Sequence, residues 1–166
     1  MSVLSWGKPK VEIAPYVSGA LPTTPTWSEL PAIQQGSAQL ETEAGEKNEA
    51  LDEGGEVVDM AMVEEDCYGS NKYTFTCALF IKKGDTKPVS DTDGVVTTNY
   101  ALKLTPEDSS TPGFYMPKCA VQLQESWTSA DGGLWTLTFS ALKPASGTML
   151  QPLSSAPASG GSGSSN

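Results

Sequence analysis

Apolar and polar residues alternate along several stretches of the chain, and this is its clearest pattern. In the run KYTFTCALFI at 72–81, every second side chain from Tyr73 to Ile81 is apolar. The run at 95–104 repeats the pattern, with Tyr100, Leu102 and Leu104 on the apolar side. A period of two with β-branched and aromatic residues predicts strands that bury one face.

Two further alternating runs flank the short segment SADGG at 129–133. The first carries its apolar side chains at Cys119, Val121, Leu123 and Trp127; the second carries them at Trp135, Leu137, Phe139 and Ala141. A glycine-rich connection between two alternating runs predicts a β-hairpin. The whole pattern therefore predicts a mainly β, antiparallel fold, with a β-sandwich as its expected form.

The two ends of the chain differ from this central part. Residues 1–35 contain five prolines, so we expect an extended arm with one short strand at 11–16. Its large apolar side chains, Trp6, Trp27 and Leu30, are expected to contact either the chain's own domain or a neighbouring subunit. Residues 36–146 are expected to form the β domain, and 147–166, rich in Ser, Gly and Pro, a flexible tail.

Helix signals are weak. The stretch EKNEALDE at 46–53, followed by two glycines, is the one candidate for a short flanking helix, and a second short strand is the alternative. No apolar run is long enough to span a membrane and the start lacks the apolar core of a signal peptide, so we expect a protein made in the cytoplasm.

Charge limits the possible functions. The 166 residues carry a formal charge of −10, and all ten basic residues are lysines, with no arginine and no histidine. Tight nucleic-acid binding normally uses a basic patch with arginine, so it is not expected. Catalysis based on histidine is excluded, no cofactor or metal motif is present, and an enzyme is not expected.

Two short features look like functional sites, but each has a simpler structural interpretation. The segment DTDG at 91–94 lacks the later ligands of a calcium loop, so we interpret it as an Asp-Gly turn leading into the next strand. Three widely spaced cysteines, Cys67, Cys77 and Cys119, are expected to be reduced and packed.

The segment at 38–59 concentrates negative charge, with eight carboxylates and one lysine. It lacks the ligand spacing of a metal cage, and its interspersed apolar residues argue against simple disorder. In 39–44, strand geometry places Glu41 and Glu43 on one side, away from the core. A solvated face of the β domain is the simplest interpretation of this charge.

The run GSAQLETEAGEKNEALDEGGEVVD, followed after eleven residues by NKYTFTCALFIKKG, resembles the central segment of siphophage-type major tail tube proteins. The resemblance covers roughly residues 27–84. It implies a β-sandwich with a flanking helix, six copies of which close a ring whose strands line a continuous barrel. Stacked rings would then form a tube that holds first a length-measuring protein and later DNA, and that ends at a terminator protein.

The resemblance gives the acidic segment a purpose. DNA carries about one negative charge per 1.7 Å of its axis, so an acidic bore lets it slide. On this reading Glu41, Glu43, Glu49 and Glu53 line the bore, while Trp6, Trp27 and Leu30 contact neighbouring subunits. The protein would reside in the virion tail and, during assembly, in the host cytoplasm. The alternatives are another phage tail β-protein, such as a terminator, baseplate or contractile-tube component, and a monomeric Ig-like binding module.

Overall fold

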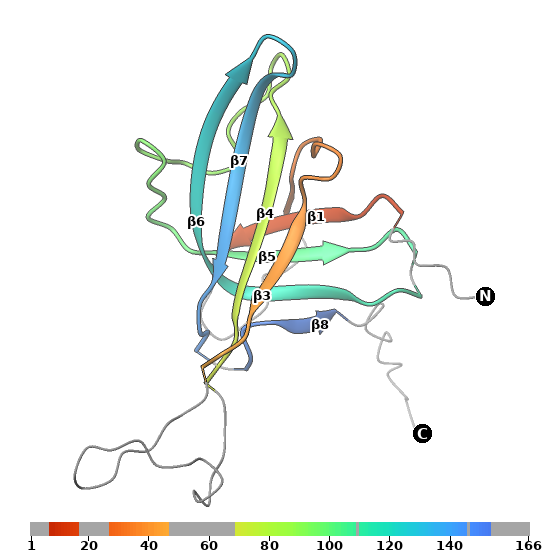
Figure 1. Ribbon diagram of the computed structural model, residues 1–166, viewed down its shortest axis with the longest axis vertical. Helices are drawn as coiled ribbons and strands as arrows, with labels where there is room; N and C mark the ends of the chain where they lie inside the picture. The colour runs from red at the N-terminus through yellow and green to blue at the C-terminus, as the bar shows by residue number, and fades with distance from the viewer. Residues whose placement is uncertain (1–6, 17–26, 47–68, 109, 146, 154–166) are drawn as a thin grey trace, which may run out of the picture.

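The computed structural model describes residues 7–16, 27–46, 69–108, 110–145 and 147–153 (Figure 1). These residues form strands and turns and contain no helix, which confirms the mainly β, antiparallel prediction. The strands are β1 (Lys10–Pro15), β2 (Ser28–Glu29), β3 (Gln39–Glu43), β4 (Lys72–Phe80), β5 (Tyr100–Thr105), β6 (Gly113–Thr128), β7 (Gly132–Ala141) and β8 (Gln151–Leu153). The helix candidate at 46–53 lies, beyond Glu46, outside the described residues.

The eight strands of the described residues belong to one hydrogen-bonded sheet rather than two separate ones. Its order is β2-β1-β5-β6-β7-β4-β3, and β8 pairs with the start of β6. The long strand β6 pairs with β5 along its first part and with β7 along the rest, so it belongs to both halves of the sheet. Figure 1 shows β1, β5 and the first part of β6 running across the direction of β4 and β7. The sheet is thus bent at β6, and it is not closed into a barrel.

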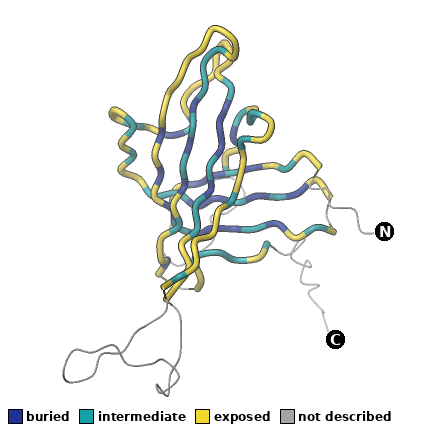
Figure 2. The backbone as a smooth tube through the Cα atoms, viewed as in Figure 1, coloured by how far each residue is buried: buried dark blue, intermediate teal, exposed yellow. Residues whose placement is uncertain are grey.

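The two halves of the bent sheet share one core. Phe75 of β4 contacts Phe114 of β6 with ring centroids 5.9 Å apart, and Phe139 of β7 at 6.2 Å. The predicted alternation is confirmed over most of β4 and β7, because Phe75, Leu137 and Phe139 are essentially inaccessible to solvent. Figure 2 shows this alternation of buried and more exposed positions along the strands.

The N-terminal segment contributes to the core. The strand predicted at 11–16 is confirmed as β1, which lies between β2 and β5 and buries Val11 and Ile13. After β2 the chain crosses to the other half of the sheet, where the Gln34 amide donates to the Ala78 carbonyl at 2.8 Å. The connection between β2 and β3 therefore covers the part of the β4 edge that β3 leaves open.

Three details of the strand predictions were wrong. The strand predicted at 95–104 begins only at Tyr100, because the turn before it folds Val95 back into a bridge with Thr92 and a second bridge with Gln122. Trp127, predicted to face inward, is 73% exposed, and Ile81 is 38% exposed. Both residues point to the same side of the sheet as the core residues before them, as predicted. They lie at the end of the sheet, where no other part of the core covers them.

Candidate functional site

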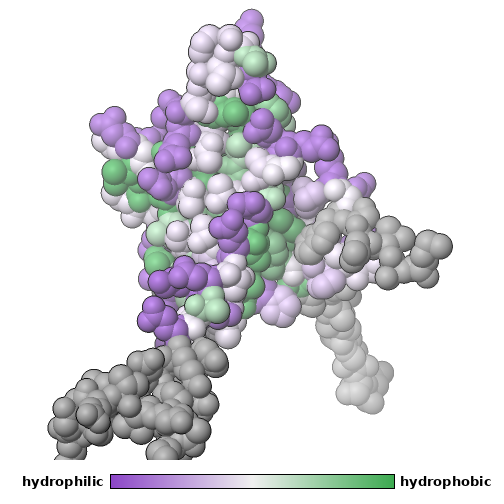
Figure 3. All heavy atoms as spheres, viewed as in Figure 1, coloured by the Kyte–Doolittle hydropathy of each residue, from purple (hydrophilic) through white to green (hydrophobic). Residues whose placement is uncertain are grey.

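The side of β3, β4, β7 and β6 that faces away from the core is a polar surface, which we call the polar face. Its polar members are Gln39, Glu41, Glu43, Lys72, Thr74, Thr76, Gln122, Gln124, Ser126, Thr136, Thr138 and Ser140. Figure 3, in the same view as Figure 1, shows pale and purple residues interspersed with green ones on this side of the molecule.

Strand register places these side chains in rows across the sheet. Gln39, Thr76, Thr138 and Gln122 stand opposite one another on successive strands, and Glu41, Thr74 and Ser140 form the next row. Threonine suits this surface because its branched side chain favours the strand and its hydroxyl stays hydrated. The polar face therefore carries mainly short, uncharged hydroxyl and amide groups. Its rows also include four apolar residues, Ala78, Phe80, Ala120 and Leu134.

Most charges of the polar face lie at one border, on β3 and the start of β4, and Lys118 of β6 adds one at the other border. Glu41 is exposed and accepts a hydrogen bond of 2.9 Å from the Gln39 amide, while Glu43 stands opposite Lys72. The prediction that Glu41 and Glu43 point away from the core is confirmed, because Leu40 between them is the partly buried residue that packs on it. Whether they line a bore stays a prediction.

The remaining predicted site residues are placed as follows. Glu49, Glu53 and Trp6 lie outside the described residues. Leu30 is buried in the core of its own chain at 6% exposure. Trp27 packs edge-on against Tyr115, with ring centroids 6.2 Å apart, and the Lys103 ammonium lies 4.5 Å from its ring centroid. Both contacts are made within one chain, and a role of these residues between subunits stays a prediction.

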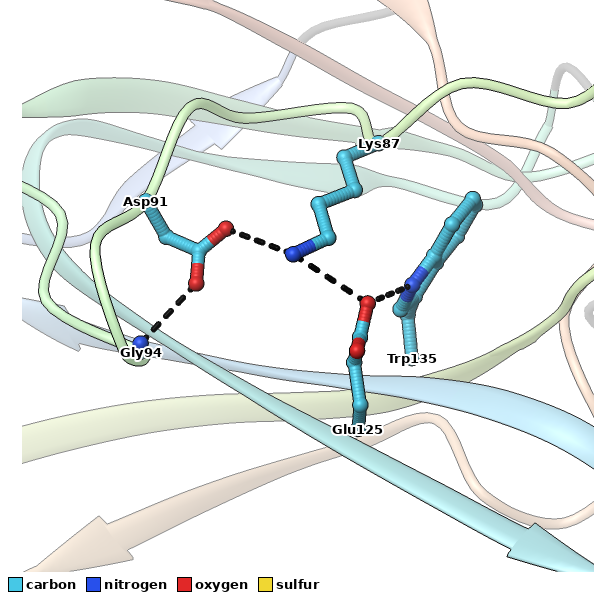
Figure 4. A network of polar contacts seen from close by, with 5 residues as sticks. All are labelled: Lys87, Asp91, Gly94, Glu125 and Trp135. Carbon is cyan, nitrogen blue, oxygen red and sulfur yellow. Dashed lines mark hydrogen bonds and ion pairs between the residues drawn. The ribbon is translucent and has the colours of Figure 1, made fainter.

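A network of polar contacts, which sequence reasoning missed, ties the segment after β4 to the β6–β7 hairpin (Figure 4). The Lys87 ammonium contacts a carboxylate oxygen of Asp91 at 3.0 Å and one of Glu125 at 3.2 Å. Glu125 also accepts a 2.8 Å hydrogen bond from the indole nitrogen of Trp135, and Asp91 accepts one of 2.9 Å from the Gly94 amide. The network lines a shallow polar depression of about 750 Å³ beside β6.

The contacts shift the ionisation of the network. The hydrogen bond from Trp135, and then that from Lys87, lowers the pKa of Glu125. The hydrogen bond from Lys87, and then the Gly94 amide, lowers the pKa of Asp91. Hydrogen bonds to these two carboxylates raise the pKa of Lys87. All three shifts favour the charged forms, so the network is an ion-pair clamp rather than an acid-base pair poised for catalysis.

The Asp-Gly turn predicted at 91–94 is confirmed by its backbone. Asp93 and Gly94 both have positive φ, 51° and 84°, and the amide and carbonyl groups of Thr92 and Val95 bond each other at 3.0 Å. The Gly94 carbonyl accepts from the Leu123 amide at 3.4 Å, so the turn rests on the edge of β6. Asp91, which accepts from the Gly94 amide and contacts Lys87, thus serves a structural role in this turn.

Other chemistry is limited in the part of the chain that the structure describes. Cys77 and Cys119 are free, buried thiols, as predicted, and burial raises the pKa of each to about 12; Cys67 lies outside the described residues. No group of acids and thiols among the described residues is arranged to hold a metal ion. Within those same ranges, no helix has the length and apolarity needed to cross a bilayer.

The sequence matches no protein-family model and shows no significant similarity to any curated protein. The geometry of the fold and the resemblance of the central segment are therefore the two indications of function.

Proposed function

We propose that the chain is a structural protein of a phage tail, and that six copies form rings that stack into the tail tube. The observation that carries this proposal is the polar face, a broad side of the sheet on which hydroxyl and amide groups outnumber the basic residues, Lys72 and, by strand alternation, Lys118. In the proposed tube this face lines the bore, with the bent sheet serving as the sandwich of the tail-tube fold.

The composition of the polar face suits a conduit for DNA. Proteins hold DNA mainly through lysine and arginine contacts to its phosphates. Here the hydroxyl and amide groups offer weak contacts that water replaces, and Glu41 and Glu43 add repulsion at one border. At physiological salt, screening limits that repulsion to about 8 Å, so it acts on DNA close to the wall. Such a wall keeps DNA centred and lets it pass without binding.

The same proposal assigns partners and location. The tube would enclose a length-measuring protein before DNA enters, would contact a terminator protein at its end, and would belong to the virion after assembly in the host cytoplasm. These assignments come from the resemblance of residues 27–84.

Self-assembly tests the proposal. Purified protein is concentrated stepwise and followed by analytical ultracentrifugation and negative-stain microscopy. The proposal predicts rings or tubes with a central bore. A monomer at every concentration contradicts it and favours a monomeric binding module.

A further inference from the structure

The edge of β6 that faces away from β7 changes character along the strand. At Gln122 and Leu123 the turn at 91–95 covers it, through the Val95–Gln122 bridge and the hydrogen bond from Leu123 to Gly94. Over 124–128, no backbone partner lies on that side among the described residues. The polar depression runs beside this open stretch, between the Lys87–Asp91 segment and Glu125 (Figure 4).

The opposite border of the four-stranded layer has a matching open edge. Strand β3, Gln39–Glu43, pairs with β4 on one side and has no described backbone partner on the other. The two open stretches have the same length, five residues each. An unprotected edge of this kind is a template for pairing with another strand.

We infer that β3 of one copy pairs with residues 124–128 of β6 in the next copy, with Leu40 opposite Trp127. This inference rests on the proposed self-assembly. The layer β3-β4-β7-β6 is antiparallel throughout and has an even number of strands, so β3 and β6 run in opposite directions. A second copy rotated about the tube axis therefore presents its β3 antiparallel to β6, and the alternation continues across the junction.

Strand parity supports this register. Full overlap of the two five-residue stretches places Leu40 opposite Trp127 and Glu41 opposite Ser126. Leu40 lies on the core side of β3, and Trp127 has the parity of Leu123 on the core side of β6. A slip by one residue would set Leu40 against the polar face, whereas this register keeps both surfaces continuous.

Trp127 supplies the anchor for the junction. It is 73% exposed in the single chain, although tryptophan is typical of residues that dominate protein interfaces. In the inferred register its ring covers the exposed part of Leu40 of the neighbouring copy. The turn at 91–95 acts as a stop, because Gly94 already occupies the edge at Leu123, so an incoming strand cannot slide further along β6.

Disulfide trapping tests the register. Glu41→Cys and Ser126→Cys are combined in one chain with Cys67→Ser, and the assembled protein is treated with a mild oxidant. Within one chain β3 and β6 are three strand spacings apart, roughly 14 Å, which is too far for a disulfide. Non-reducing electrophoresis is expected to show a ladder of covalently linked copies. The offset control, Glu41→Cys with Gln124→Cys, is expected to give little or none.

A second variant tests the anchor without new cysteines. Trp127→Ala is expected to raise the concentration needed for assembly about tenfold or more, with an unchanged melting transition of the monomer. The matched control is Leu142→Ala, another exposed apolar residue, 37% exposed and outside the junction, which is expected to have little effect.

The two experiments separate the register from the proposed function. Tubes that form with no disulfide-linked ladder from the Glu41–Ser126 cysteine pair, or with a stronger ladder from the Glu41–Gln124 pair, contradict the register but not the proposed function. If Trp127→Ala assembles at the same concentration as the unmodified protein, Trp127 does not anchor the junction. Failure of the unmodified protein to assemble overturns the proposed function and this inference together.

Discussion

The Trp135 indole donates a 2.8 Å hydrogen bond to Glu125, the residue directly opposite it on β6. The same carboxylate oxygen lies 3.2 Å from Lys87, which also binds Asp91. One side chain near the end of the hairpin thus joins the β6–β7 pair to the segment that carries the turn on the β6 edge. Because that turn limits the open edge, the network bears directly on how copies would join.

Acid is expected to release this turn before it affects the core. The pKa values of Asp91 and Glu125 are lowered in the folded chain, so their stabilisation is present at neutral pH and is lost as the pH falls below about 4, through the folded pKa values. Amide hydrogen exchange measures this, as the protection factor of Leu123, which donates to Gly94, relative to that of buried Leu137. Asp91→Asn is the control, since it removes the part of the pH dependence that comes from Asp91 and leaves the part that comes from Glu125. Equal protection of Leu123 at neutral and acid pH would contradict the assigned clamp.

Gly94 is required by its backbone and by its surroundings. Its φ is +84°, and a Cβ there would lie 2.7 Å from the Leu123 carbonyl oxygen. Gly84 has a similar φ of +87° but open space around it, so Gly84→Ala should lose about 1–2 kcal/mol from the left-handed backbone alone. Gly94→Ala should lose at least about 1 kcal/mol more, because the turn must move off β6. Denaturant unfolding of both variants measures the difference, and equal losses would argue against the close approach.

Phe139 is the test of the shared core. It is fully buried and packs against Phe75 of the neighbouring strand. Phe139→Ala is expected to lower the free energy of unfolding by about 3–5 kcal/mol, because a large cavity remains. Gln122→Ala, on the polar face, should change it by about 0.5 kcal/mol or less. Chemical denaturation of both variants checks this, and a loss below about 1 kcal/mol for Phe139→Ala would mean that the core beneath β4 and β7 is not tightly packed.

Reversing the acidic border of the polar face should impair DNA passage but not assembly. Glu41→Lys with Glu43→Lys replaces two negative charges by two positive ones beside Lys72 on the proposed wall, a net change of +4 per copy. Particles assembled with this variant are expected to eject DNA more slowly, with the defect relieved by added salt. Glu29→Lys with Asp131→Lys makes the same charge change away from the polar face and should eject normally. Normal ejection by the Glu41/Glu43 variant would show that these carboxylates face elsewhere.

Much of the sheet could be predicted from the sequence, because alternation is a local signal. The pattern around Phe75, Leu137 and Phe139 identifies both the strands and their buried sides, and the Asp-Gly turn follows from residues that tolerate positive φ. Local pattern does not say where the core ends. Trp127 keeps its parity, yet it is exposed because no second half of the sheet extends over it.

The site was less predictable, because its parts come together only through tertiary pairing. Lys87 and Asp91 lie in an irregular segment with no periodicity, and their partner Glu125 is distant in the chain. Counting outward from the hairpin turn would have placed Glu125 opposite Trp135, but nothing local indicates that Lys87 joins them. The single sheet likewise depends on β6, whose length lets one strand serve both halves.

The central claim is that the polar face lines a channel made by repeated copies of the chain. A cryo-electron microscopy map of the assembled protein tests this most directly. The account predicts a tube whose inner wall is formed by β3, β4, β7 and the end of β6, with Thr76 and Thr138 in the bore. A particle without a channel, or one with these threonines on its outer surface, would contradict it.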